Sequence, residues 1–138
     1  MGEQVTMSDS NTTELSQRID AIESGYEFLL AYAAQGRRTD RGAGANLNVR
    51  EFLQGMDTAL NDLGAVCTTA ARAKHGGKTV QYQAFLDVLA DDARKARGVI
   101  RLVLACQDIS SQLVDNMNTN VHLRALLTDL FVIDDALK

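Results

Sequence analysis

Three arginines stand close together in a glycine-rich stretch of a chain that is acidic overall. The stretch reads QGRRTDRGAGANLN, and the chain carries a formal net charge of -4. A guanidinium presents its N–H donors in a planar fork that suits phosphates and carboxylates. The glycines at positions 42 and 44 would let such an anion approach the backbone. The sequence therefore predicts an anion- or partner-binding site that comprises Arg37, Arg38, Arg41 and Arg50.

The same arginines also have a simpler interpretation as surface charges. Asp40, Asp108 and Asp115 are expected at the same end of the molecule. Exposed ion pairs with these groups would contribute about 1 kcal/mol or less to stability. The sequence leaves both interpretations open, and under the first of them Arg97 and Arg101 would approach the arginine-rich loop.

A second candidate site lies in the first apolar segment, where an acidic residue interrupts a hydrophobic turn. A carboxyl group buried at Glu27 would have a raised pKa and could act as an acid or a base. The alternative is an acidic residue at the edge of the apolar stripe. The corresponding prediction is a pocket between helices that is bounded by Tyr26, Tyr32 and Glu27.

The residue patterns predict no metal, no cofactor and no catalytic group. A di-iron bundle needs a Glu-x-x-His motif on two helices, but Arg72 and Thr119 stand three residues before the two histidines. The GGKT stretch at positions 76–79 lacks the earlier glycine of a phosphate-binding P-loop. Cys67 and Cys106 are expected as free, buried side chains, because a helical hairpin would separate them by about 30 Å. An enzyme is therefore the less favoured interpretation.

The absence of proline and the spacing of apolar residues predict long helices. Apolar residues recur at alternating intervals of four and three, which is typical of helices that pack side by side at a shallow angle. The fold class is therefore all-α, an antiparallel four-helix bundle in up-down-up-down order. The last connection can break the third or fourth helix into shorter pieces. The helices are expected over about 13–35, 48–74, 80 to a connection at 115–120, and 120–137.

The expected domain organisation is a disordered tail over residues 1–12 and a single helical-bundle domain over 13–138. The last helix carries more apolar residues than one stripe can hold, and the adjacent Phe131 and Val132 cannot both face one core. A homo-oligomer, with a dimer favoured, would cover the excess. The predicted interface comprises Leu126, Leu130, Phe131, Val132 and Ile133.

The composition of the chain indicates which classes of protein it resembles. Hydrophobic residues make up 46% of the chain and charged residues 23%, which is typical of a globular protein. The longest apolar runs are too short for a membrane span, and the polar N-terminus does not resemble a signal peptide, so a cytoplasmic protein is expected. A net acidic chain with few aromatic residues does not favour nucleic-acid binding.

The predicted function is that of a non-enzymatic interaction or accessory protein, which self-associates and binds another protein as a scaffold, adaptor or regulator. The alternative is an anion- or small-molecule-binding protein, or an enzyme. Its site would lie at the arginine-rich loop or near Tyr26 and Glu27.

Overall fold

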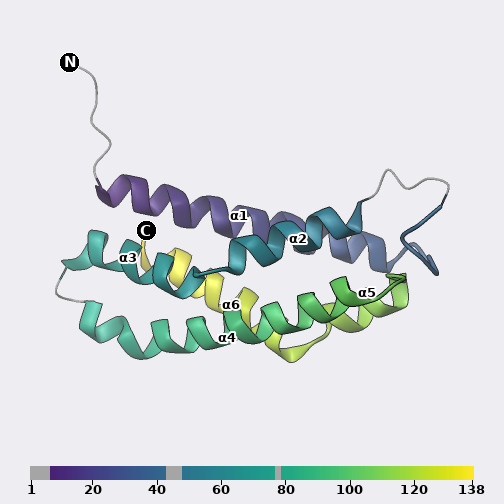
Figure 1. The fold of residues 1–138 in the computed structure, drawn as a ribbon. Coiled ribbons are helices and arrows are strands. Elements are labelled where there is room, and N and C mark those ends of the chain that lie inside the picture. Colours follow the sequence, from purple (N-terminus) through teal and green to yellow (C-terminus); the bar gives the residue numbers. More distant parts are fainter. Residues whose placement is uncertain (1–6, 43–47, 77–78) are drawn as a thin grey trace, which may run out of the picture.

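The computed structural model describes residues 7–42, 48–76 and 79–138, and all regular structure in these ranges is helical (Figure 1). The all-α class predicted from the sequence is confirmed. Gly44, Gly77 and Lys78, which belong to two of the motifs considered above, lie outside the described residues. The helices are α1 (Met7–Ala33), α2 (Val49–Leu60), α3 (Leu63–His75), α4 (Thr79–Ala105), α5 (Ser111–Asn118) and α6 (Val121–Ala136).

The helices lie along one long axis and enclose a single apolar core. Figure 1 shows α1 and α4 as the two long helices, with α2 and α3 in succession along them and α6 returning towards the end where α1 begins. α1 packs mainly on α2, α3 and α5, whereas α4 packs mainly on α2, α3 and α6. Side chains such as Ile22, Leu53, Leu89 and Leu126 are fully buried between them.

The predicted single helix over 48–74 is wrong, because the chain breaks between α2 and α3. Asn61 adopts an extended conformation, and Asp62 has a left-handed backbone with φ of 58°. Asn and Asp side chains compete with helical hydrogen bonds, but the apolar spacing continues across the break and conceals it. Arg18 of α1 donates to the carbonyls of Ala59 and Asn61, so the exposed end of α2 is satisfied from a neighbouring helix.

The connection predicted at 115–120 is largely helical. α4 ends at Ala105, and α5 begins after Ser110, whose hydroxyl accepts a hydrogen bond from the Leu113 N–H. Asn120 caps α6, since its side chain accepts from the N–H groups of His122 and Leu123. At the other end of the chain, α1 already begins at Met7, so the boundary expected at residue 12 falls inside this helix.

A glycine sets the distance between α3 and α4. A Cβ atom at Gly64 would lie 2.5 Å from the Cβ of Ala90 and 3.1 Å from its Cα. We expect Gly64→Ala to lower the free energy of unfolding by about 1–3 kcal/mol, because the helices would have to separate. Gly98→Ala is the matched control, since its Cβ would meet no atom within 4 Å, and a gain of up to about 1 kcal/mol is expected there. Urea denaturation that showed both changes to be stabilising would contradict this packing.

The two cysteines differ in their surroundings. Cys67 is buried in α3, and burial raises the pKa of its thiol to about 12. Cys106 follows α4 and is only half-buried, so the expectation that both are buried is wrong for this residue. Both are free thiols in the structure.

None of the helices in the described ranges combines the length and the apolar character that crossing a membrane requires.

Candidate functional site

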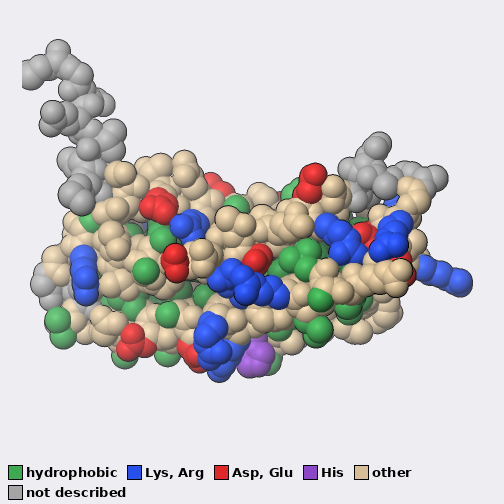
Figure 2. Space-filling model, in the orientation of Figure 1, with side chains coloured by type: hydrophobic (Ala, Val, Ile, Leu, Met, Phe, Trp, Pro, Cys, Tyr) green, Lys and Arg blue, Asp and Glu red, His purple; other side chains and the backbone are tan. Residues whose placement is uncertain are grey.

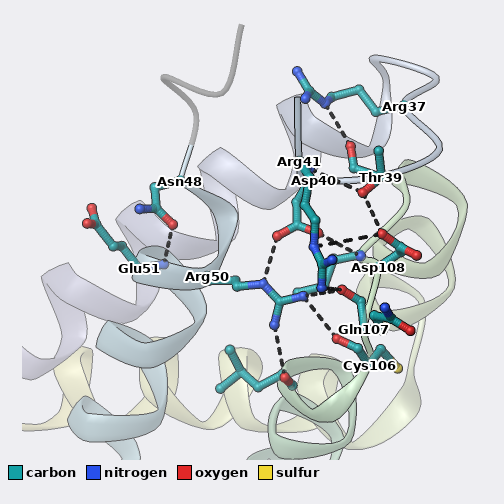
Figure 3. Close-up of polar contacts among 12 residues, drawn as sticks. Arg37, Thr39, Asp40, Arg41, Asn48, Arg50, Glu51, Cys106, Gln107 and Asp108 are labelled. Carbon is teal, nitrogen blue, oxygen red and sulfur yellow. Dashed lines mark hydrogen bonds and ion pairs between the residues drawn. The ribbon is translucent and has the colours of Figure 1, made fainter. Parts of the chain in front are cut away.

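Arg50, at the start of α2, binds the end of α4 rather than a free anion. Its guanidinium donates to the carbonyl oxygens of Leu104, Cys106 and Gln107 at distances of 2.9–3.1 Å (Figure 3). These carbonyls belong to the last turn of α4 and its continuation, where helical partners are lacking. A cation there also interacts favourably with the negative end of the helix dipole. Arg50 therefore acts as a C-terminal cap supplied by another helix.

Asp40 completes this arrangement, which we call the Arg50 clasp (Asp40, Arg50 and the carbonyls of residues 104, 106 and 107). Its carboxylate lies 2.7 Å from Arg50 Nε and also accepts the backbone N–H of Ile109 at 3.0 Å. The Asp40 side chain is only 9% exposed. Burial acts to raise the pKa of this carboxyl, but the hydrogen bonds from Arg50 and Ile109 outweigh it and hold the pKa below its ordinary value.

The other arginines of the predicted site divide into engaged and free side chains. Arg41 donates to the Gln107 carbonyl at 2.8 Å, and Arg37 Nε donates to the Thr39 carbonyl within its own loop. Arg38 is exposed, and its side chain makes no hydrogen bond or ion pair to the described residues. The structure therefore brings Arg41 and Arg50 together at the end of α4, but leaves only Arg38 unengaged.

The loop is also tied to the start of α5 through Ser111. The Arg37 N–H donates to Ser111 Oγ, which in turn donates to the Tyr32 carbonyl, and the Ser111 N–H donates to the Arg37 carbonyl. Tyr32 is buried, and its hydroxyl donates to the Ile109 carbonyl at 2.6 Å. Tyr32 is thus a core residue that joins α1 to the α4–α5 connection, and it does not line a pocket with Tyr26 and Glu27.

Arg97 and Arg101 do not join the arginine loop as the sequence suggested. Their Nε atoms lie 2.9 and 3.2 Å from Asp57 of α2, and Arg97 also donates to the Asn61 side chain. Hydrogen bonds from Arg97, opposed by burial, lower the pKa of the Asp57 carboxyl. On the face drawn in Figure 2, basic side chains accordingly occur beside acidic ones, both over α2 and α4 and at the end with the α1–α2 connection.

A groove of about 350 Å³ lies between α1 and α6. α6 packs mainly on α4 and only sparsely on α1, so these two helices leave part of their facing surfaces uncovered. Two residues of the second predicted site, Tyr26 and Glu27, line the groove on the α1 side. The sequence could not supply the other wall, because the pairing of α1 with α6 is a tertiary feature. The lining residues are Glu23, Tyr26, Glu27, Arg124, Leu127, Thr128 and Phe131.

Glu23 is a carboxyl of this groove whose pKa is raised. Burial raises the pKa of Glu23, and the nearby carboxylates of Asp20, Asp134 and Glu27 raise it further. Glu27 itself is exposed, which agrees with the alternative of an acidic residue at the edge of the apolar stripe and not with a buried acid. The α1 side of the groove is therefore acidic, and among the described residues no cation forms an ion pair with Glu23.

The predicted oligomer interface falls into two parts. Leu126, Leu130 and Ile133 are buried in the core of the chain itself. Phe131 is 60% exposed and Val132 is 50% exposed. Only these last two residues are therefore available to a partner without unfolding, and Phe131 also forms one lip of the α1–α6 groove.

An acidic pair joins α6 to α4 on the side away from this groove. Burial raises the pKa of Asp129 to about 7, and the neighbouring carboxyl of Asp92 contributes to the rise. The Oδ2 atom of Asp129 is buried and has no hydrogen-bond partner among the described residues. The protonated, neutral form of Asp129 is therefore favoured in the folded chain.

Neither a metal-binding cluster nor a similarity to known proteins indicates a function for this chain. Within the part of the chain that the structure describes, no group of three His, Cys, Asp or Glu side chains is arranged to hold a metal ion. Comparisons with models of protein families, with curated proteins and with solved structures found no match.

Proposed function

We propose that the protein is a non-enzymatic interaction protein, which self-associates through α6 and binds another protein as a scaffold, adaptor or regulator. The observation that carries this proposal is the pair of adjacent, exposed side chains Phe131 and Val132, next to a groove that α1 and α6 leave open. Large apolar side chains that border a groove are typical of protein–protein contacts. A dimer is the favoured assembly, because two-fold pairing is the commonest symmetry of soluble homo-oligomers.

We propose that the fold is an up-down-up-down four-helix bundle in which two of the four helical segments, here called limbs, are each interrupted by a break. A bundle of this kind suits such a role. In this view α2 and α3 form the second limb, and α5 and α6 form the fourth. Support comes from the path of the chain in Figure 1 and from the arginines, Arg18 and Arg50, that bind helix ends at or near the breaks. These contacts of Arg18 and Arg50 would stabilise the helices that support the exposed face of α6.

Phe131→Glu is expected to dissociate the assembly without unfolding the chain. The side chain is mostly exposed, so the charge is tolerated in the monomer, whereas burying an unpaired carboxylate in an interface is strongly unfavourable. We expect the dissociation constant of the dimer to rise at least about tenfold. Light scattering over a concentration series would measure it, and circular dichroism would check the fold.

Leu102→Glu is the matched control, because Leu102 of α4 is 67% exposed and lies outside the groove. This variant should assemble as the unaltered chain does. Equal weakening by both substitutions would show that the response to Phe131→Glu is not specific to α6.

A second candidate function is the binding of an anionic ligand near Arg38. A hollow of about 510 Å³ is lined by Arg37, Arg38 and the first residues of α5, where the helix dipole favours negative charge. Two α5 N–H groups there are already engaged, since Ser111 donates to Arg37 and Leu113 donates to Ser110. Titration with inorganic phosphate should shift the amide resonances around Ser110 if this function holds, and should leave them unchanged if it does not.

A further inference from the structure

The α1–α6 groove carries opposite charges at its two ends. α1 and α6 run in opposite directions, as Figure 1 shows. Arg124 lies two helical turns before Phe131 on α6, which places it about 10 Å from that residue along the helix. Because α1 runs antiparallel to α6, Glu23, which precedes Tyr26 and Glu27 on α1, lies at the Phe131 end of the groove. The lining of the groove therefore extends from Arg124 at one end to Glu23 at the other.

The cation and the acid of this groove do not neutralise each other within the chain. Arg124 is exposed, and its guanidinium forms no hydrogen bond or ion pair with the described residues. Glu23 likewise has no cationic partner among them, and Asp134 is paired only with the exposed Lys138. Between the two ends lie Tyr26, Leu127, Thr128 and the protruding Phe131, with the exposed Glu27 beside them on α1.

We infer that a second copy of this chain occupies the groove, with the two α6 helices antiparallel and Arg124 of each copy beside Glu23 of the other. A two-fold axis brings the same surface patch of two copies together in reverse order. A patch with a cation on α6 at one end, the acids Glu23 and Glu27 on α1, and apolar side chains from both helices is complementary to itself in this arrangement. The inference rests on the proposed self-association and assigns its surface and its charge pairs.

The free arginine also distinguishes this occupant from a basic segment of another protein. A basic partner would match Glu23 and its neighbouring acids, but it would place like charges near Arg124. A second copy satisfies both ends at once, and the exposed ring of Phe131 from each copy can enter the apolar middle of the other groove. Charge pairs of this kind select the partner and the register of an interface.

Charge reversal in two separate chains tests this pairing. In an Arg124→Glu homodimer both charge contacts would join acid to acid, and in a Glu23→Arg homodimer both would join base to base. Each variant alone should therefore raise the dissociation constant at least about tenfold, because like charges in an interface repel. Mixed together, the two variants should form a heterodimer within about threefold of the original affinity, since both contacts then join opposite charges.

Native mass spectrometry distinguishes the heterodimer from either homodimer by mass, and sedimentation velocity gives the affinities. Arg72→Glu is the control for Arg124→Glu, because Arg72 is an exposed residue of α3 outside the groove. Mixing it with Glu23→Arg should give a weaker heterodimer than the charge-reversed pair gives, because one of the two contacts still joins base to base. Arg124→Gln and Glu23→Gln provide milder variants, which should weaken the dimer less, and their heterodimer should recover part of the affinity because one of its two contacts is the original pair of Arg124 with Glu23.

Three results would overturn the inference. If the unaltered chain dimerises but neither reversal weakens it, the charge pairs are wrong, and Phe131→Glu decides separately whether α6 forms the interface. If both reversals weaken it and the mixture stays weak, Arg124 and Glu23 do not face each other. If the unaltered chain is monomeric, the proposed self-association fails together with this inference.

Discussion

Replacement of Arg50 by leucine is expected to lower the free energy of unfolding by about 3 kcal/mol, the low end for breaking a buried ion pair. The substitution leaves the carboxylate of Asp40 almost fully buried without its cation, and it removes the Arg50 donors from three carbonyls at the end of α4, of which that of Gln107 keeps its hydrogen bond from Arg41. The Arg50 side chain is itself 29% exposed, so water can enter and limit the loss. Urea denaturation followed by circular dichroism measures the change.

Two further variants separate the clasp from the mere loss of a positive charge. Arg50→Lys keeps the charge but not the planar fork, so an intermediate loss is expected. Arg38→Gln removes an unengaged charge from the same end of the molecule and should change stability by no more than about 0.5 kcal/mol. Equal stabilities for Arg50→Leu and Arg38→Gln would contradict the capping role of Arg50.

The Arg50 clasp also predicts how the free energy of unfolding changes at acidic pH. The pKa of Asp40 is lowered in the folded chain, so its carboxylate stabilises the fold above the ordinary Asp pKa of about 4. This contribution is lost as the pH falls through the lowered pKa. In Arg50→Leu the pKa of Asp40 should no longer be lowered, and the loss of stability in acid from this group should disappear.

Asp129→Asn is expected to stabilise the protein at about pH 8 by roughly 1–3 kcal/mol, with little effect near pH 4. The pKa of Asp129 is raised to about 7 in the folded chain, so folding binds a proton that the unfolded chain has already released. The unaltered protein should therefore lose stability as the pH rises from about 4 to about 7. Asparagine removes the charge and abolishes that dependence, and the estimate allows for the partial exposure of the pair.

Asp135→Asn provides the control for this prediction, because Asp135 is an exposed residue of the same helix. Its stability profile should follow that of the unaltered chain between about pH 4 and 8. Thermal unfolding at a series of pH values compares the three proteins. If Asp129→Asn kept the original pH dependence, the raised pKa of Asp129 would not be its cause.

The apolar periodicity of the sequence predicted the helices correctly where no local break interrupted it. Apolar residues at intervals of four and three were expected to share a packed face, and Leu15, Ile19 and Ile22 are buried. The second helix was expected from residue 48, and Asn48 caps α2 there by accepting the Glu51 N–H. The break at Asn61 was missed because Leu60 and Leu63 continue the apolar spacing on both sides of it. Helix periodicity describes which face is buried, but it does not register a local turn that tertiary hydrogen bonds stabilise.

The candidate sites were only partly predictable for a related reason. The clustered arginines identified the loop between α1 and α2 as a candidate site. The partners of Arg50 and Arg41 are backbone carbonyls, which every residue has, so the sequence could not identify them. Tyr26 and Glu27 were identified on one wall of the groove, whereas Arg124 on the other wall depends on which helices become neighbours. The adjacent Phe131 and Val132 were informative because two consecutive helical residues cannot face one core.

Sedimentation equilibrium of the unaltered chain tests the central claim most directly. We expect a homodimer with a mass of about 30 kDa, twice the chain mass of 15.0 kDa, at concentrations of tens of micromolar, and we expect it to dissociate on dilution. Phe131→Glu, run in parallel, should remain near the chain mass throughout. A mass of 15.0 kDa for the unaltered chain at every concentration would contradict the proposed self-association through α6.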